Sequence, residues 1–128
     1  MPMKKLSFLL AFTLFQSMTA ISASESTDYL HCTHSKDSSI DHYYWSITSK
    51  DKIERWVNGK PISVINSLVM NNQKNIAWNE MANPMGIFVL DKKTMRQSGT
   101  LLTDANQILD RWVSECAFIK KDKFLGLQ

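Results

Sequence analysis

The architecture of this chain depends on the segment RWVSECAFIK, residues 111–120. Its side chains alternate, so that Trp112, Cys116 and Phe118 fall on one face of an extended strand. Cys116 has one possible disulfide partner in the sequence, Cys32. A bond between the two would close a loop of about 85 residues and stabilise the fold by about 4.5 kcal/mol on the chain-entropy model. The first and last strands would then have to lie side by side.

The first 23 residues have the pattern of a secretory signal peptide. Lys4 and Lys5 precede the apolar run Leu6–Phe15, and small residues around Ala23 mark a cleavage point. The apolar run is too short for the ~20 residues that cross a bilayer, so we expect no membrane span after signal removal. We predict a signal peptide over residues 1–23 and a single β-rich domain over residues 24–128, periplasmic or secreted. Two cysteines fit that oxidising location.

Charge argues against a nucleic-acid partner. The formal net charge is +3, and it falls to +1 when Lys4 and Lys5 leave with the leader. Nucleic-acid binding requires an extended basic face. The remaining basic cluster, Lys120, Lys121 and Lys123, is interpreted as a solvated tail.

Short segments separated by turn residues follow one another along the chain, which is typical of an antiparallel barrel or sandwich. The polar stretch Ser35–Asp41 is predicted to be a loop, and the aromatic stretch His42–Thr48 a strand. Asn58-Gly59 predicts a hairpin turn, because both residues readily take positive φ. Pro61 cannot donate to a ladder and therefore belongs at a strand start or an edge.

Two segments fit a helix as well as a strand. In residues 61–70 the apolar positions have helical spacing, but their β-branched content favours a strand. In residues 104–116 the apolar positions again fit a helix that Asp104 would cap, and the neighbouring short strands favour a strand over Ile108–Ile119. We therefore predict an all-β fold: a small antiparallel barrel or strongly curled sheet of about seven to eight strands, with one disulfide.

Several short motifs resemble those of a diffuse group of small exported bacterial proteins, most of them uncharacterised. The motifs are the early Cys32, Trp45, the pair Ile76-x-Trp78, Leu90-Asp91-Lys92-Lys93-Thr94, and the ending Trp112-Val113-Ser114-Glu115-Cys116. Members of the group have a Leu-Asp-Arg-x-Thr-Gly-like turn and a Trp-x-Gly-x-Cys ending. This sequence departs from them at Lys92, Met95 and Ser114, where Arg, Gly and Gly are usual. The resemblance implies an antiparallel, disulfide-tied β fold and no particular activity.

A looser likeness, in architecture and cysteine placement alone, is to periplasmic inhibitors of c-type lysozyme. No residue of the inhibitory motif carries over.

We find no constellation in the sequence that predicts catalysis or a cofactor. Residue types that bind zinc or copper occur together in His31-Cys32-Thr33-His34. However, His31 and His34 point to opposite faces of a strand, and Cys32 is better used in a disulfide. There is no Gly-x-Ser-x-Gly elbow, and four glycines offer no phosphate-binding loop. We predict a protein that is not an enzyme, with no metal and no cofactor.

The aromatic residues suggest a contact surface. Most are expected in the core, with Tyr43, Trp45 and Ile47 on one strand face. Tyr44 then faces the other way, and Trp56 lies on the strand face opposite Ile53 and Val57. We predict an exposed contact patch at Tyr44 and Trp56. The sequence thus predicts an exported, non-enzymatic binding or interaction module whose partner is an unidentified protein or small ligand. The alternatives are an inhibitor of a hydrolase and, third, a carrier of small hydrophobic ligands.

Overall fold

The computed structural model describes residues 26–49 and 51–128. The predicted signal peptide, residues 1–23, lies outside the described residues. Nine strands and one short helix follow in chain order: β1 Thr27–Lys36, β2 Ser39–Thr48, β3 Lys52–Val57, β4 Lys60–Pro61, β5 Ile65–Asn71, β6 Asn75–Met81, β7 Met85–Asp91, β8 Arg96–Leu102, β9 Ile108–Ile119 and α2 Lys121–Gly126.

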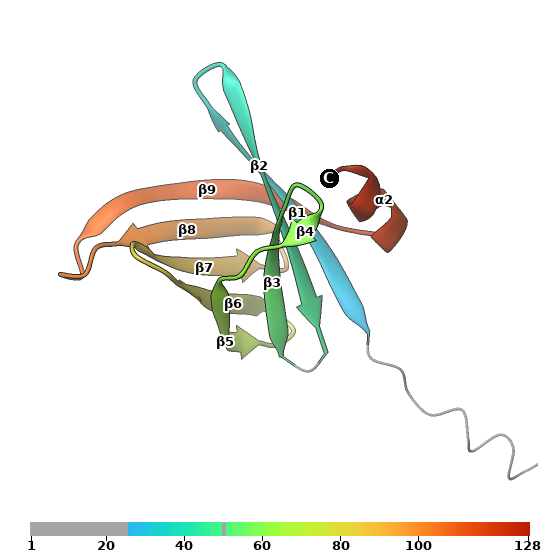
Figure 1. Ribbon diagram of the computed structural model, residues 1–128, viewed down its shortest axis with the longest axis horizontal. Helices are drawn as coiled ribbons and strands as arrows, with labels where there is room; N and C mark the ends of the chain where they lie inside the picture. The colour runs from blue at the N-terminus through green and yellow to red at the C-terminus, as the bar shows by residue number, and fades with distance from the viewer. Residues whose placement is uncertain (1–25, 50) are drawn as a thin grey trace, which may run out of the picture.

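All nine strands form one antiparallel sheet in the order β4-β3-β2-β1-β9-β8-β7-β6-β5. The two ends of this order, β4 and β5, are consecutive in sequence, and β3 comes close to β5. The sheet therefore curls almost back onto itself as a half-barrel, as Figure 1 shows. The predicted all-β class and strong curl are confirmed.

The predicted strand count of seven to eight is wrong by one, because residues 60–71 form two strands, β4 and β5, instead of one. Asn58 and Gly59 form the expected turn with φ of 53° and 80°, but the returning strand β4 pairs only at Lys60 and Pro61. Ile62 still donates its N–H to the carbonyl oxygen of Arg55 at 2.9 Å, so the Pro61 nitrogen faces away from β3, at the edge of the sheet. The chain then crosses to the opposite edge of the sheet and starts β5 at Ile65, so residues 61–70 are not one continuous strand.

The Cys32–Cys116 disulfide is confirmed, and it joins the two strands that connect the halves of the sheet. β1 and β9 pair over Tyr29–Thr33 and Glu115–Ile119, with Cys32 directly opposite Cys116. The backbone N–H of Cys116 donates to Met95 on the β8 side. The two cysteines therefore form a non-hydrogen-bonded pair, in which Cα atoms approach most closely, here 4.0 Å apart. In the described chain this ladder alone connects β1–β4 with β5–β9.

The core fills the concave side of the sheet. Alternate residues point inward, as the sequence predicts for Trp45 and Ile47 in β2 and for Ile76 and Trp78 in β6. Trp45, Trp78 and Phe88 form its centre, with ring centroids 4.9–5.6 Å apart. The buried cluster consists of Leu30, Cys32, Trp45, Ile47, Ile53, Ile76, Trp78, Phe88 and Leu90.

Lys120, Lys121 and Lys123 are exposed as interpreted, but the segment that carries them is not an extended tail. Lys121–Gly126 forms the helix α2, and its Phe124 is fully buried on the outer face of the sheet. β9 runs from Ile108 to Ile119 as predicted, and residues 104–107 form the turn before it, with Asn106 at a φ of 59°.

Candidate functional site

A concave surface lies where the β1–β2 hairpin leaves the sheet. β1 pairs with β9 only as far as Thr33, and β2 pairs with β3 only from Tyr44 onward. Beyond these points β1 and β2 continue to pair only with each other, up to Lys36 and Ser39. This two-stranded arm, His34–His42, projects from the rest of the sheet in Figure 1.

The arm also corrects the predicted loop at Ser35–Asp41. Only Asp37 and Ser38 form the turn, and Asp37 takes a φ of 53°. Aspartate tolerates this left-handed conformation better than most residues. The remaining polar residues extend the two strands, which makes the arm long enough to form one wall of a groove.

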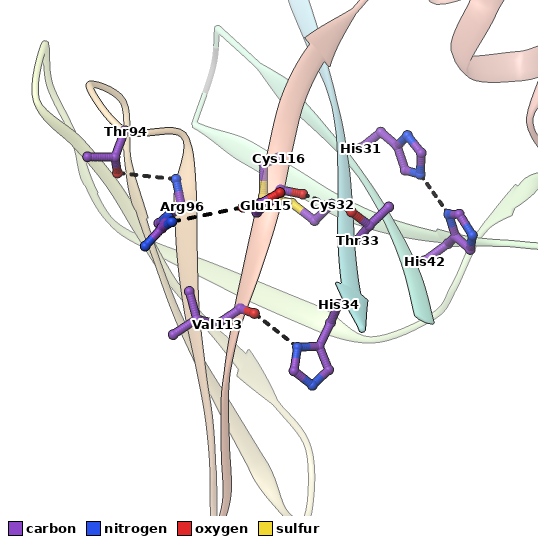
Figure 2. The surroundings of a disulfide bond; sticks show 10 residues. All are labelled: His31, Cys32, Thr33, His34, His42, Thr94, Arg96, Val113, Glu115 and Cys116. Carbon is purple, nitrogen blue, oxygen red and sulfur yellow. Dashed lines mark hydrogen bonds and ion pairs between the residues drawn. A yellow bond between two sulfur atoms is a disulfide. The ribbon is translucent and has the colours of Figure 1, made fainter. Parts of the chain in front are cut away.

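The opposite wall is the part of β9 that has no β1 partner. A single side chain spans the gap just beyond the disulfide: His34 Nδ1–H donates to the carbonyl oxygen of Val113 at 2.9 Å, as Figure 2 shows. The inward-facing residues of the arm and of β8–β9 then enclose a hollow of about 250 Å³. Its lining residues are His34, Lys36, Asp41 and Tyr43 from the arm and Leu101, Asp110, Arg111 and Trp112 from β8–β9. We call this hollow the arm groove.

The floor of the arm groove is aromatic. Tyr43 and Trp112 lie nearly parallel, with an interplanar angle of 24° and ring centroids 6.2 Å apart. Trp112 rests on Gly99, its partner across the β8–β9 ladder. A Cβ atom at Gly99 would come within 2.5 Å of the indole ring, so the position of Trp112 depends on this glycine.

The groove continues inward to a largely buried ion pair. A second hollow of about 200 Å³ shares Tyr43, Leu101 and Trp112 with the first and reaches Arg55 and Glu80. Arg55 Nε and Nη2 donate to the two oxygens of Glu80 at 2.9 and 3.0 Å. The two side chains are only 28% and 13% exposed. This bidentate pair joins β3 to β6 and so closes the half-barrel from inside.

The phenol of Tyr43 is held in its protonated form. Burial is the largest cause that raises its pKa, and the carboxylates of Asp41 and Asp110 raise it further, against an opposing effect of Arg55. The hydroxyl is therefore a hydrogen-bond donor at any physiological pH. The same causes place carboxylates from both walls of the groove near this hydroxyl.

The predicted contact residues Tyr44 and Trp56 lie elsewhere, on the outer face. They sit directly opposite each other in the β2–β3 ladder, so the prediction that they share a face is consistent with the register. They are half-buried rather than exposed, because Phe124 of α2 packs edge-on against both rings, with centroids 5.8 and 5.4 Å away. Trp56 Nε1 donates to Ser46 Oγ at 2.9 Å. The patch that the sequence predicts as exposed is thus covered by the chain's own C-terminus.

His31 and His34 point to opposite faces of β1, as the sequence predicts. His31 lies on the outer face, bonded to His42, whereas His34 reaches across to β9 (Figure 2). Within the described residues, no three His, Cys, Asp or Glu side chains come together in a group that could hold a metal ion.

Sequence reasoning missed two features of these surfaces. Trp112 and Tyr43 were expected in the core, yet both line the arm groove. Phe124 drew no prediction, because a six-residue helix is too short to show an apolar period. The run Phe124-Leu125 after the lysines is the only signal that could have indicated it.

Comparisons with protein-family models, with curated proteins and with solved structures find no match to this chain. None of the described helices is long and apolar enough to cross a membrane. The fold and site define a class: a curled, all-antiparallel β protein with one disulfide and a groove beside a projecting hairpin arm. The disulfide is compatible with an oxidising, exported location.

Proposed function

We propose that this protein is an exported, non-enzymatic binding module that grips a segment of a partner protein in the arm groove. The observation that carries the proposal is the Tyr43–Trp112 floor between two charged walls. Tyrosine, tryptophan and arginine are the residue types that dominate binding energy at protein interfaces, and they do so in concave, well-packed positions.

The size and character of the groove favour a protein segment over a small apolar ligand. The two hollows, of about 250 and 200 Å³, share Tyr43, Leu101 and Trp112 and are open to solvent, whereas small-molecule sites typically bury most of their ligand. The walls carry charges of both signs, Lys36 and Asp41 on one side and Asp110 and Arg111 on the other. The centre of the half-barrel is filled by Trp45, Trp78 and Phe88 rather than hollow, so a hydrophobic-ligand carrier is less well supported.

Charge reversal in the groove tests the proposal. The mature, oxidised protein would carry a photo-crosslinking residue in place of Asp41, and exported fractions would serve as the source of partner. We expect a discrete adduct that disappears in Lys36→Glu/Arg111→Glu. The matched control is Lys93→Glu/Arg96→Glu, which makes the same charge change at exposed positions outside the groove.

Two outcomes would contradict the proposal. One is an adduct that survives reversal of both groove charges. The other is the same adduct formed equally well from a crosslinker at Ser98, which is exposed on the outer side of β8.

A hydrolase inhibitor is the second candidate, and the projecting arm favours it. An inhibitor needs a protruding element that enters a cleft, and the arm ends in a two-residue turn with Ile40 59% exposed beside it. Residual activities of c-type lysozymes and of proteases, measured with and without the protein, would test this. Inhibition that is lost in Ile40→Asp would support it, and full activity of every enzyme would count against it.

A further inference from the structure

The C-terminal helix is held on the sheet by one aromatic side chain. Phe124 is fully buried, and its ring contacts Tyr29, Tyr44 and Trp56 at centroid distances of 4.8, 5.8 and 5.4 Å. Isolated helices shorter than about 12 residues are not stable in water, so the six residues of α2 depend on this docking. Its N-cap, Lys120, makes no side-chain capping bond. The helix should therefore detach from the sheet when the contacts of Phe124 weaken.

A histidine pair lies at the edge of this aromatic cluster. His31 stacks on Tyr44 with an interplanar angle of 7° and ring centroids 4.8 Å apart. Its Nε2 lies 2.9 Å from Nδ1 of His42 (Figure 2). This hydrogen bond requires one nitrogen to accept, so it is lost when both imidazoles are doubly protonated. Two imidazolium ions at this distance would also repel each other.

The charges around His31 oppose its protonation. Its pKa is lowered, first by burial, then by His42 on β2 and by Lys123 on α2. On β9 the residue opposite is the uncharged Ala117. Glu115 lies 4.0 Å from Arg96, and Glu54 of β3 lies 3.9 Å from Lys52. On α2 the acidic residue is Asp122, whose Oδ1 accepts the backbone N–H of Lys123 at 2.9 Å. Among the described residues, no carboxylate is a cause of the lowered pKa of His31.

We propose that α2 is an acid-sensitive cover that docks over Tyr44 and Trp56 at neutral pH and releases them when His31 and His42 are protonated. The direction of the pH effect follows from the linkage between proton binding and helix docking. Release removes Lys123 from the neighbourhood of His31, so the released form takes up a proton more readily than the docked form. Docking is therefore fully favoured above the ordinary histidine pKa of 6.5 and weakens as the pH falls below it.

The consequence is a second contact surface that is open only in acid. Tyr44 and Trp56, the residues that the sequence predicts as a contact patch, are half-buried while Phe124 covers them. Release would expose two adjacent aromatic rings on one sheet face. This surface lies on the opposite side of the sheet from the arm groove, so the inference does not rest on the proposed function.

The test is NMR of the mature, oxidised protein between pH 8 and pH 5, with the amide of Phe124 as the reporter of docking. That amide donates to Lys120 in the docked helix at 2.9 Å. We expect the α2 resonances to move to random-coil positions as the pH falls below about 6.5, while those of the Trp78 core stay in place. In His31→Gln/His42→Gln the helix should stay docked to pH 5, and in His34→Gln, the matched control, it should release as in the wild type.

Two further variants guard against misfolding of the double variant. Lys123→Gln should raise the pKa of His31 and move release to lower pH, because it removes the nearby ammonium charge without changing the aromatic cluster. Phe124→Ala should release the helix at every pH. The proposal is overturned if the wild-type helix stays docked at pH 5, or if Lys123→Gln leaves the midpoint of release unchanged.

Discussion

Removal of the disulfide tests how the two halves of the sheet are held together. The cysteines are 84 residues apart in sequence, and the ladder that they join has five residue pairs. A loop of this length corresponds to about 4.5 kcal/mol of chain entropy, and native disulfides typically contribute about 2–5 kcal/mol. We therefore expect Cys32→Ala/Cys116→Ala to lose about 4 kcal/mol of unfolding free energy, which is a large part of a total of about 5–15 kcal/mol. Tm should fall by about 15–20 °C.

The assay is urea and thermal unfolding of the wild type and the double variant, each with and without reductant. Reduced wild type should match the double variant, and reductant should not change the double variant. Alanine is the right replacement because Cys32 is fully buried and a serine hydroxyl would add its own desolvation cost. A double variant within 1 kcal/mol of the oxidised wild type would refute the reasoning.

Three further predictions concern the groove. Gly99→Ala should displace Trp112, because the new Cβ would come within 2.5 Å of the indole ring. Tryptophan fluorescence should then shift to the red, and the free energy of unfolding should fall by about 1–3 kcal/mol. An unchanged emission spectrum would contradict this. Glu80→Gln leaves the Arg55 guanidinium in a largely buried site without its counter-charge, so the free energy of unfolding should fall by about 2–3 kcal/mol. Arg55→Met/Glu80→Met, which removes both charges, should lose less stability than that in urea unfolding. Tyr43 should ionise at higher pH than an exposed tyrosine, so the folded protein should lose stability as the pH rises above about 10. In an ultraviolet titration its ionisation should follow that of exposed tyrosines. In Tyr43→Phe both this late transition and the loss of stability should be absent.

The strands could be predicted where burial alternates strictly. Trp45 with Ile47, and Ile76 with Trp78, show the period of two that a sheet with one buried face imposes. The disulfide followed from the presence of only two cysteines in a chain predicted to be exported. The helical alternative for residues 104–116 failed because β9 packs between two strands, and that tertiary context decides between two periods that the sequence allows equally.

The arm groove could not be predicted, because it depends on where ladders end. Nothing in the sequence around Thr33 indicates that β9 stops pairing with β1 there while β2 continues. The cover on Tyr44 and Trp56 was missed for a related reason. A single phenylalanine in a lysine-rich terminus has no periodicity to reveal it, yet its burial changes the exposure of two residues some 70–80 positions away.

Amide hydrogen exchange at Val113 and Ala117 tests most directly whether the arm separates from β9. The N–H of Cys116 points toward β8, and successive N–H groups along an antiparallel strand point to opposite neighbours. The N–H groups of Val113 and Ala117 therefore both point toward β1. Ala117 pairs with His31, whereas Val113 lies beyond the last β1–β9 pair, Thr33 with Glu115. Exchange should be slow at Ala117 and close to the unprotected rate at Val113, with the Trp112 amide protected by β8 as the internal control. Equally slow exchange at Val113 and Ala117 would mean that the ladder continues, the arm stays in the sheet and the groove does not exist.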